Sequence, residues 1–493
     1  METQAGRAEV SFVIEKPVAA GSGEGISADD VIYLIMIDRF SDGDPTNDAP
    51  RDAPPEANDR ENPRAFHGGD LRGVINHLSY LKELGVTAIW LTPWYDNWNG
   101  LNRCDKPWCP GTYYHGYHTI DYYGVEDRFG DLQTVRELVQ KAHALGLKVI
   151  QDQVANHVGS QHPWVQDPPL PDWFHGTLAE HQLNPFKNSA LLSPHANPSE
   201  VREVLDGWFS DDLPDMNQDE PEVARYEIQN ALWWVGVAGI DAIRQDTIQY
   251  MPRTFIRDLS NALHRQYPRF WMVGEVFQRD AAHTAFFIGG HTGWDGIDTR
   301  LDSVFDFALW NTSLNVFTNK LPVRALRDEL KYDALYPDPA RLTVLTNNHD
   351  TQRFLSLEGA TLSGAKLHTA FTLSVRGIPQ LYYGEEIAME GGEDPDNRRD
   401  FPSRAFNAGG RNAKEQEMFE WTRAWIRLRR EHSAIRRGHL IDLVYDDNVY
   451  VFARQDKSET VIIGINRQDT DQQVAIPFKS IVPLIGKIRV STG

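Results

Sequence analysis

The sequence predicts an α/β protein built on a (β/α)8 TIM barrel, with a small domain inserted after the third strand and an all-β sandwich domain at the C-terminus. Three observations predict the barrel. Eight apolar segments of strand length recur along the chain, stretches with helical periodicity separate most of them, and several of the segments end in charged residues. A doubly wound sheet is the structural alternative, but it rarely carries eight strand–helix units.

The eight strand segments are rich in Val, Ile and Leu, as expected for strands that are buried on both faces. They begin near Val31, Ala88, Lys148, Ile240, Trp271, Asp302, Leu342 and Ile378. The clearest helices between them are predicted at 71–85 and 132–146, because each stretch has a helical period and closes with a Gly. A last barrel helix is predicted at 417–432, which gives a barrel over 28–435.

One connection is too long to be a simple loop. Between Ala155 and about Leu213 the sequence is rich in Pro, Asn, His and Trp and has little helical period, which predicts an inserted domain at about 158–213. Short alternating runs after the last helix predict a β-sandwich domain over 436–493. Residues 1–27 are rich in Gly, Ala and Glu, and we expect them to form a loosely docked N-terminal tail.

Composition narrows the classes of partner. The chain has 493 residues, 41% of them hydrophobic, and a formal net charge of −21. This charge argues against nucleic acid or an anionic membrane surface as a partner and fits a neutral substrate better. No segment approaches the roughly 20 apolar residues that are needed to span a bilayer. A monomer and a homodimer both stay open.

The cellular compartment is also left open. The N-terminus lacks a basic leader and an apolar signal core, which leaves a cytoplasmic protein or a mature periplasmic or secreted form, the second being slightly favoured. Cys104 and Cys109 are the only cysteines. They are either two free thiols or a short-loop disulfide, and a disulfide would indicate an oxidising compartment.

Four strand ends carry the candidate chemistry, and they read KVIQDQVANH (148–157), GIDAIRQD (239–246), WMVGEVF (271–277) and LTVLTNNHD (342–350). Asp246, Glu275 and Asp350 emerge there, and paired carboxylates are the chemistry of glycoside cleavage. Arg244 lies two positions before Asp246, so on a strand both side chains point the same way and the guanidinium can keep the carboxylate ionised. Glu275 follows an apolar strand, where burial would raise its pKa, as a general acid requires.

These segments resemble the α-amylase superfamily of glycoside hydrolases over roughly residues 28–465, and within it the group of neopullulanases, cyclomaltodextrinases and periplasmic α-amylases. The motifs DQVANH, LPDMN, GIDAIRQD, GEVF and NNHD occur in the family's order. The resemblance implies that Asp246 is the nucleophile, Glu275 the general acid/base and Asp350 the stabiliser of the transition state. It also implies sugar contacts from Tyr117, His157, Arg244, His349, Asp394 and Arg398.

Two loops crowd oxygen atoms together, in DRFSDGDPTND (38–48) and FHGGD (66–70). Such clustering alone usually indicates a solvated turn. The pattern resembles a calcium loop of cyclodextrin glucanotransferases and neopullulanases, which implies Ca²⁺ bound by Asp42, Asp44, Asn47, Asp48, the carbonyl of Gly68, and Asp70. Asn156 and Asp215 match the family's other calcium site, although Tyr250 stands there where His is usual.

The expected activity is that of a retaining hydrolase of α-1,4 bonds in starch and maltooligosaccharides, with pullulan and cyclodextrins as further candidates. A transglycosylating relative, either a glucanotransferase or a trehalose-forming isomerase, is the alternative and would share every catalytic residue. A non-catalytic carbohydrate-binding protein is disfavoured, because Asp246, Glu275 and Asp350 are all present. The loop after the second strand offers Trp94, Trp98 and Trp108 as candidate stacking platforms for sugars.

Overall fold

Eight parallel strands form the centre of the molecule. The computed structural model describes residues 2–3, 6–7, 15–18, 23–104, 109–477 and 481. The barrel strands follow one another in the order β3 (Ile32–Ile35), β4 (Ala88–Leu91), β7 (Lys148–Gln153), β8 (Ala242–Gln245), β9 (Trp271–Gly274), β10 (Ser303–Val304), β11 (Thr343–Leu345) and β12 (Ile378–Tyr382). Each strand pairs in parallel with its neighbours, β12 pairs with β3, and a bridge between Phe305 and Thr343 joins β10 to β11, so the barrel closes. The predicted (β/α)8 fold and all eight strand positions are confirmed.

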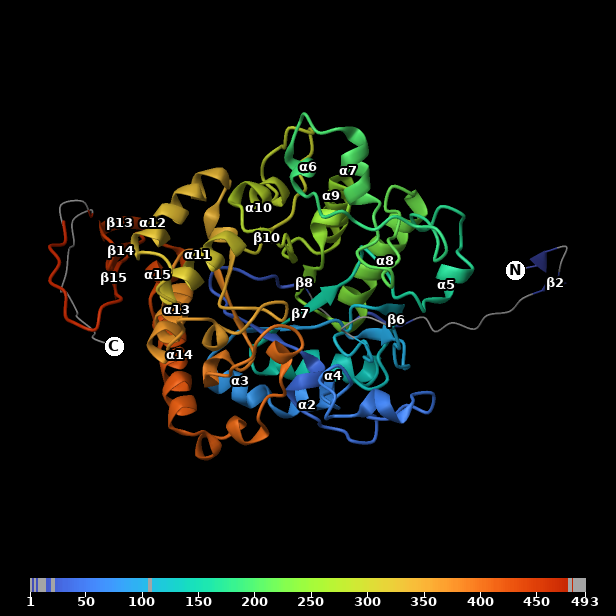
Figure 1. The fold of residues 1–493 in the computed structure, drawn as a ribbon, viewed down its shortest axis with the longest axis horizontal. Coiled ribbons are helices and arrows are strands. Elements are labelled where there is room, and N and C mark those ends of the chain that lie inside the picture. The colour runs from blue at the N-terminus through green and yellow to red at the C-terminus, as the bar shows by residue number, and fades with distance from the viewer. Residues whose placement is uncertain are drawn as a thin grey trace.

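Helices surround the barrel (Figure 1), and they are α2 (Leu71–Asn76), α3 (Leu78–Leu84), α4 (Leu132–Ala144), α8 (Pro221–Ala238), α9 (Arg253–Gln266), α10 (Ala281–Phe287), α11 (Phe307–Phe317), α12 (Arg324–Leu330), α13 (Leu362–Ser374) and α14 (Ala413–Glu431). The stretch predicted as one helix at 71–85 is two helices that meet at His77, whose ring stacks on Phe406. Asp70 caps the first helix, and Gly85 ends the second with φ of 101°. The last barrel helix begins four residues earlier than predicted, because Asn412 and Glu415 form a capping box.

The long connection after β7 holds three short helices and otherwise irregular chain. These helices are α5 (Pro163–Gln166), α6 (Ser189–Leu192) and α7 (Pro198–Leu205). Trp208 is fully buried, and its indole donates a hydrogen bond to the carbonyl of His175 at 2.5 Å. An isolated bridge between His157 and Asp215 ties the segment back to the end of β7. A smaller antiparallel pair, β5 (Tyr95–Asn97) and β6 (Thr119–Val125), follows β4.

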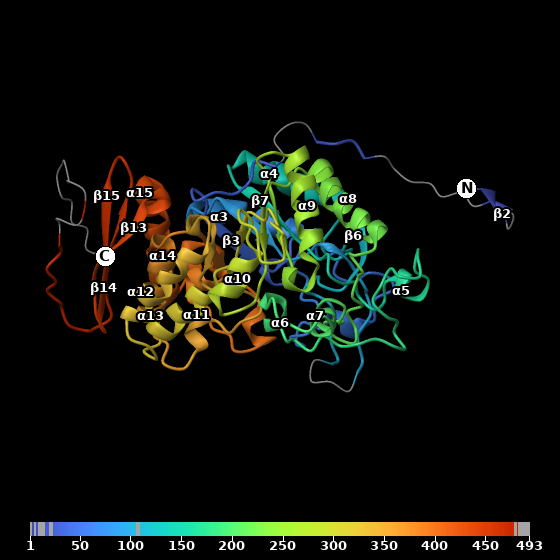
Figure 2. The same cartoon turned by 90° about the horizontal axis from the view of Figure 1, so that it is seen from above.

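The C-terminal domain lies at one end of the long axis, and the pair of β1 (Glu2–Thr3) and β2 (Gly6–Arg7) lies at the other, beyond α5, as both views show (Figures 1 and 2). Its described part is an antiparallel sheet of β13 (His439–Tyr445), β14 (Val449–Gln455) and β15 (Thr460–Asn466), which follows the short helix α15 (Ser433–Arg437). The predicted sandwich over 436–493 includes 478–480 and 482–493, which lie outside the described residues. The described part of the chain contains no helix long and apolar enough to cross a membrane.

The segment before the barrel and one loop within it are tied down locally. Of the predicted N-terminal tail, the backbone of Val18 donates to Gly236 and that of Gly23 donates to Ile240, so these residues follow the outer edge of α8. Cys104 and Cys109 form a disulfide, the second of the two alternatives.

Candidate functional site

A single buried guanidinium lies at the centre of the site. Arg244 of β8 has no exposed surface. Its Nη1 lies 2.7 Å from Asp152 Oδ1 and 2.6 Å from Asp246 Oδ1, and its Nη2 lies 2.7 Å from Glu275 Oε1. Three neighbouring strands, β7, β8 and β9, therefore deliver their carboxylates to one cation. The predicted grouping of Arg244, Asp246 and Glu275 is present in the structure.

Glu275 is held in its acid form. Burial raises the pKa of its carboxyl group to about 8; Arg244 acts to lower it, while the neighbouring charges of Asp246 and Asp350 raise it further. Burial therefore outweighs the adjacent guanidinium. A carboxyl group with this pKa carries a proton at neutral pH, whereas Asp246 sits in the same cavity with a guanidinium hydrogen bond.

Two residues that the sequence did not single out organise these carboxylates. Asp152 accepts hydrogen bonds from Trp90 Nε1 at 2.9 Å and from the Tyr117 hydroxyl at 2.8 Å, in addition to Arg244. Parallel register sets Asp152 opposite Arg244, a pairing that no sequence pattern reveals. Thr247 adopts the left-handed region with φ of 44°, which few non-glycine residues do. Its backbone N–H donates to Glu275 Oε2 at 3.2 Å and its hydroxyl donates to Asp246 Oδ2 at 3.1 Å.

Asp350 faces the same cavity from the end of β11. Its side chain is 36% exposed, with one oxygen 3.4 Å from His349 Nε2 and the other 3.1 Å from Arg398 Nη2. Burial acts to raise the pKa of Asp350, but His349 and Arg398 lower it below its usual value. Of these two residues, only Arg398 lowers the pKa of Asp350 through its charge at neutral pH. Burial lowers the pKa of His349 to about 4, so that ring is neutral at this pH. Asp350 is therefore an ionised carboxylate.

Neutral hydrogen-bonding groups complete the wall of the cavity. The Tyr117 ring stacks on His349 with centroids 5.3 Å apart and an angle of 7° between the planes. His157 Nε2 lies 3.2 Å from the Tyr117 carbonyl, and burial lowers the pKa of His157 to about 4. The cavity has a volume of about 370 Å³ and is lined by Tyr117, His157, Asp246, Glu275, His349, Asp350 and Arg398, among others.

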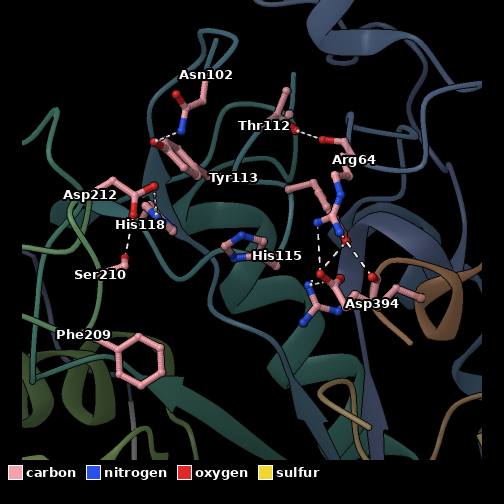
Figure 3. Close-up of a pocket in the computed structure, with 13 residues that line it drawn as sticks. Arg64, Asn102, Thr112, Tyr113, His115, His118, Phe209, Ser210, Asp212 and Asp394 are labelled. Atoms are coloured by element: carbon pink, nitrogen blue, oxygen red, sulfur yellow. Dashed lines mark hydrogen bonds and ion pairs between the residues drawn. The ribbon is translucent and has the colours of Figure 1, made fainter. Parts of the chain in front are cut away.

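A second cavity of about 340 Å³ adjoins the first and shares His115, His118, Phe209 and Arg398 with it. Figure 3 shows Arg64 and Asp394 facing each other on one side and His118 with Asp212 on the other. Asp394 lies 3.0 Å from Arg64 Nη1 and 3.1 Å from Arg398 Nη1. Charges therefore alternate from Asp350 through Arg398 and Asp394 to Arg64. Asp394 lines this second cavity rather than the first.

One part of the wall of the first cavity is aromatic, and of its rings Phe209 also lines the second cavity. Phe209 is 37% exposed and Phe277 38% exposed, and both line the first cavity together with Tyr250. Phe186 extends this aromatic rim, with its ring 5.3 Å from Phe209 and 6.0 Å from Tyr250. Gln249 also lines the first cavity, and its Oε1 has no hydrogen-bond partner among the described residues.

Of the tryptophans proposed as stacking platforms, Trp94 does not fill that role. Trp94 is fully buried and packs edge-on against Trp234 at 5.6 Å. Trp98 is half-buried beside Tyr113 at 6.3 Å. Trp108 lies outside the described residues. The prediction is therefore wrong for Trp94, because the loop after β4 turns inward and its indole becomes part of the core.

The predicted calcium loop contains oxygen atoms that are suited to a cation. Asp42 Oδ1, Asn47 Oδ1 and Asp48 Oδ1 are buried without a hydrogen-bond partner among the described residues. A Cβ atom built on Gly68 would clash with Arg60 Nη2 and would lie 2.6 Å from Asp48 Oδ1, so only a glycine lets the backbone approach this ion pair. The pKa of Asp48 is raised by burial and by the charge of Asp42. These features fit a bound cation.

Several carboxylates of the predicted ligand set already have partners within the protein. Asp70 accepts from the backbone N–H groups of Gly43, Asp44 and Gly73, and Asp44 accepts from Thr46. The Arg60 guanidinium lies 2.6 Å from Asp42 Oδ2 and 2.8 Å from Asp48 Oδ2. Among the described residues, no three His, Cys, Asp or Glu side chains gather as they do around a metal ion.

The second calcium position is partly taken by an imidazole. Asn156 Oδ1 and Asp215 Oδ1 are buried without a partner in the described part of the chain. The other oxygen of Asp215 lies 2.7 Å from His175 Nδ1, and burial raises the pKa of Asp215 to about 7. His175 therefore supplies part of the positive charge at this position.

Comparison with known proteins agrees with the geometry of the site. The family model described as "Alpha amylase, catalytic domain" matches residues 34–426. Over 454 residues the chain is 31% identical to a β/α-amylase of Paenibacillus polymyxa, covering 90% of this chain but only 34% of that protein. It is 30% identical to a cyclomaltodextrinase of Geobacillus thermopakistaniensis, covering 91% of this chain and 71% of the other. A crystal structure of an Anoxybacillus α-amylase is 34% identical, with a TM-score of 0.75 over 91% of this chain and 88% of that one.

Proposed function

The chain belongs to the α-amylase family of glycoside hydrolases, and from this membership we propose that it cleaves α-1,4-glucosidic bonds of starch and maltooligosaccharides with retention of configuration. Pullulan and cyclodextrins are further candidate substrates. The observation that carries the proposal is the Arg244 guanidinium, which contacts the carboxylates of Asp246 and Glu275 in one cavity. Two carboxyl groups beside one substrate position, one protonated and one ionised, are what a retaining glycosidase needs.

The proposed reaction has two steps. Glu275 donates its proton to the glycosidic oxygen while Asp246 attacks the anomeric carbon, which forms a covalent glycosyl-enzyme and releases the leaving sugar. Glu275 then takes a proton from a water molecule that attacks the same carbon and frees Asp246. Asp350, kept ionised beside Arg398, stabilises the positive charge that develops on the sugar ring.

The second cavity supports binding of sugars on the non-reducing side of the cut bond. Arg64, Asp394 and Arg398 form its charged wall, and His118 and Asp212 form the facing wall. Guanidinium and carboxylate groups that are already paired can still hydrogen-bond sugar hydroxyls through their remaining atoms. A substrate chain that fills both cavities therefore places its scissile bond between Asp246 and Glu275.

Transfer to a sugar acceptor is the second candidate activity, and the aromatic rim is the observation that favours it. Phe209, Tyr250 and Phe277 offer flat apolar faces to a sugar that arrives at the covalent intermediate. The same faces reduce the access of water to the intermediate. Hydrolysis and transfer differ only in which hydroxyl attacks, so the products distinguish them.

We predict that Asp246→Ala abolishes turnover of maltotriose and that Glu275→Gln lowers kcat by about 10²- to 10⁴-fold, because each change removes a reacting group. Rates are measured by chromatography of the products. Asp241→Asn serves as a matched control, since Asp241 is a buried carboxylate at the opposite end of β8, where it pairs with His143.

Either variant retaining wild-type activity would contradict the assignment. In the wild type, glucose and maltose as the sole products indicate hydrolysis. Oligosaccharides longer than maltotriose, or trehalose, indicate the transferring alternative. Binding of α-glucans without any product would contradict both.

The pH profile gives a second prediction. Glu275 must carry a proton to act as an acid, and its pKa is raised to about 8. We expect kcat/KM to hold up to that pH and then to fall about tenfold for each further pH unit. Stopped assays on maltotriose across pH 6 to 10 measure this fall of kcat/KM. A kcat/KM that already declines from near the ordinary pKa of a glutamate would contradict the prediction.

Asp152 is a positioning residue, because it holds Arg244, Tyr117 and Trp90 without facing the substrate position. We expect Asp152→Asn to lower kcat by about 10- to 100-fold, the worth of about 1.5–3 kcal/mol of charge-assisted hydrogen bonding, with little change in KM. Without the Asp152 carboxylate, Arg244 interacts more strongly with Glu275 and lowers its pKa. The fall of kcat/KM at alkaline pH should therefore begin at a lower pH. A merely structural loss would reduce the melting temperature and leave the pH of that fall unchanged.

We further propose that the loop at 42–48 binds Ca²⁺ through Asp42, Asn47, Asp48 and the Gly68 carbonyl. The three buried oxygen atoms without partners and the raised pKa of Asp48 support this proposal. Hard oxygen donors are the ligands that Ca²⁺ prefers, and a bound ion would relieve the repulsion between the carboxylates. The ion would stabilise the fold, since Gly68 lies two residues before Asp70, the N-cap of α2.

The calcium proposal predicts that chelation lowers the melting temperature and that added Ca²⁺ restores it, whereas Mg²⁺ does not. Calcium at about a hundred times its dissociation constant would contribute about 2.7 kcal/mol to the free energy of unfolding. Differential scanning calorimetry with and without chelator measures this. Asp48→Asn should abolish the response, and Asp215→Asn should leave it intact. A chelator-insensitive wild type with no bound metal would overturn the proposal.

A further inference from the structure

One tryptophan stands apart from the others. Trp294 is 53% exposed, more than any other large apolar side chain among the described residues. It lies in the loop 289–300, which connects α10 to β10. It lines neither of the two cavities of the active site. A single exposed apolar side chain is ordinary on a protein surface, so a site here is indicated by how Trp294 is held and not by its exposure alone.

The indole is backed by a stack of flat groups. Its ring is nearly parallel to that of Phe286, with an angle of 14° and centroids 6.1 Å apart. The Arg253 guanidinium lies 3.8 Å from the Phe286 ring. Arg253 also pairs with Asp295 and donates a 3.0 Å hydrogen bond to the Ile297 carbonyl. Arg253 therefore fixes the loop to the start of α9, and the Phe286 ring packs against one side of the Trp294 indole.

The loop itself is a rigid turn. The backbone N–H of Gly293 donates to the Ile297 carbonyl at 2.9 Å, and that of Gly290 donates to Asp298 Oδ1 at 2.9 Å. Gly290, Gly296 and Arg300 have φ of 99°, 79° and 59°, and for the non-glycine Arg300 this conformation is strained. Because the loop is already ordered, a ligand that stacks on Trp294 has little conformational entropy to remove.

The loop is linked to the catalytic end of the barrel. Arg253 opens α9, seven positions after Asp246 along the chain, and Phe286 lies on α10, which follows Glu275. Helix α10 has seven residues, about 10 Å in length. His283 on α10 lies 2.9 Å from the Asn188 carbonyl, and Figure 1 shows α10 beside α6. The exposed indole therefore lies on the side of the molecule where the inserted segment meets the barrel.

The surroundings of Trp294 define the chemistry of its ligand. No other large apolar side chain of α10 or the loop is exposed in the described chain, so the patch is too small for a stable protein interface. Thr292 and Arg300 are exposed beside it and offer hydrogen bonds. A flat apolar face with a polar margin suits a sugar ring, and the net charge of −21 fits an uncharged ligand.

We propose that Trp294, supported by Phe286 in the loop 289–300, is a second binding site for α-glucan chains outside the catalytic cleft. It holds a polymeric substrate on the surface while a different part of the same chain, or a neighbouring chain, enters the cavities. The identity of the glucan rests on the proposed function; the platform itself does not.

The test compares the full-length wild type with Trp294→Ala, Trp294→Tyr and Tyr332→Ala. Adsorption to starch granules in the cold and KM on soluble amylopectin report on the platform, while kcat/KM on maltotriose reports on the cleft. Tyr332 is a matched control because it is 42% exposed and lies in a different surface segment, Lys331–Leu335.

We expect Trp294→Ala to weaken adsorption by about two- to tenfold, the worth of one aromatic stacking contact, and to raise KM on amylopectin with kcat/KM on maltotriose unchanged. Trp294→Tyr should keep most of the binding. Equal adsorption of Trp294→Ala and wild type would overturn the proposal, as would a change of oligomeric state in gel filtration, which would assign the surface to a second copy. Trp294→Gln replaces the alanine variant if that one unfolds. Failure of the wild type to cleave maltotriose would count against the proposed function, and adsorption would still decide the platform.

Discussion

The site depends on one buried cation shared by three acids. Arg244 lies within 2.6–2.7 Å of Asp152, Asp246 and Glu275 and has no access to bulk water. If all three carboxyl groups were ionised, the cluster would carry two uncompensated negative charges in a medium that solvates them poorly. A proton therefore stays within the cluster; burial raises the pKa of Glu275 to about 8 and that of Asp152 to about 7, so Glu275 holds the proton more strongly. The division into one acid and one nucleophile follows from this charge balance, before any substrate is bound.

The same balance extends outward along the cleft. Asp350, Arg398, Asp394 and Arg64 alternate in sign from the cavity with the catalytic carboxylates to its neighbour. Each charge is paired, so a neutral sugar meets a polar wall that attracts hydroxyl groups without demanding a charged ligand. Elsewhere in the first cavity the wall is formed by the rings of Tyr250 and Phe277, which do not line the second cavity. Under the proposed function, a sugar in the second cavity would meet hydrogen-bonding groups, and a sugar beside Tyr250 and Phe277 would meet apolar rings.

The sequence predicted the barrel and the catalytic cluster because both depend on strands. An apolar run has a readable length, and the carboxyl ends of parallel strands must meet, so Asp246, Glu275 and Asp350 were expected together. Asp152 also lies on such a strand but was missed, since its importance comes from the register between β7 and β8, which pairs it with Arg244. Thr247 left no signal, because nothing in its residue type indicates φ of 44°.

Loops were predicted poorly for a physical reason. Trp94 and Trp294 both lie in loops between regular elements, yet one is fully buried and the other is 53% exposed. No periodicity relates a loop residue to a face, so its burial is decided by contacts from distant parts of the chain, Trp234 for the first and Arg253 with Phe286 for the second. An aromatic residue in a loop therefore acquires its role only after folding. In the proposed function, the bond that is broken depends on a charge cluster held by the barrel strands, whereas glucan selection would depend on separate aromatic contacts of the loops, each of which can change without disturbing the others.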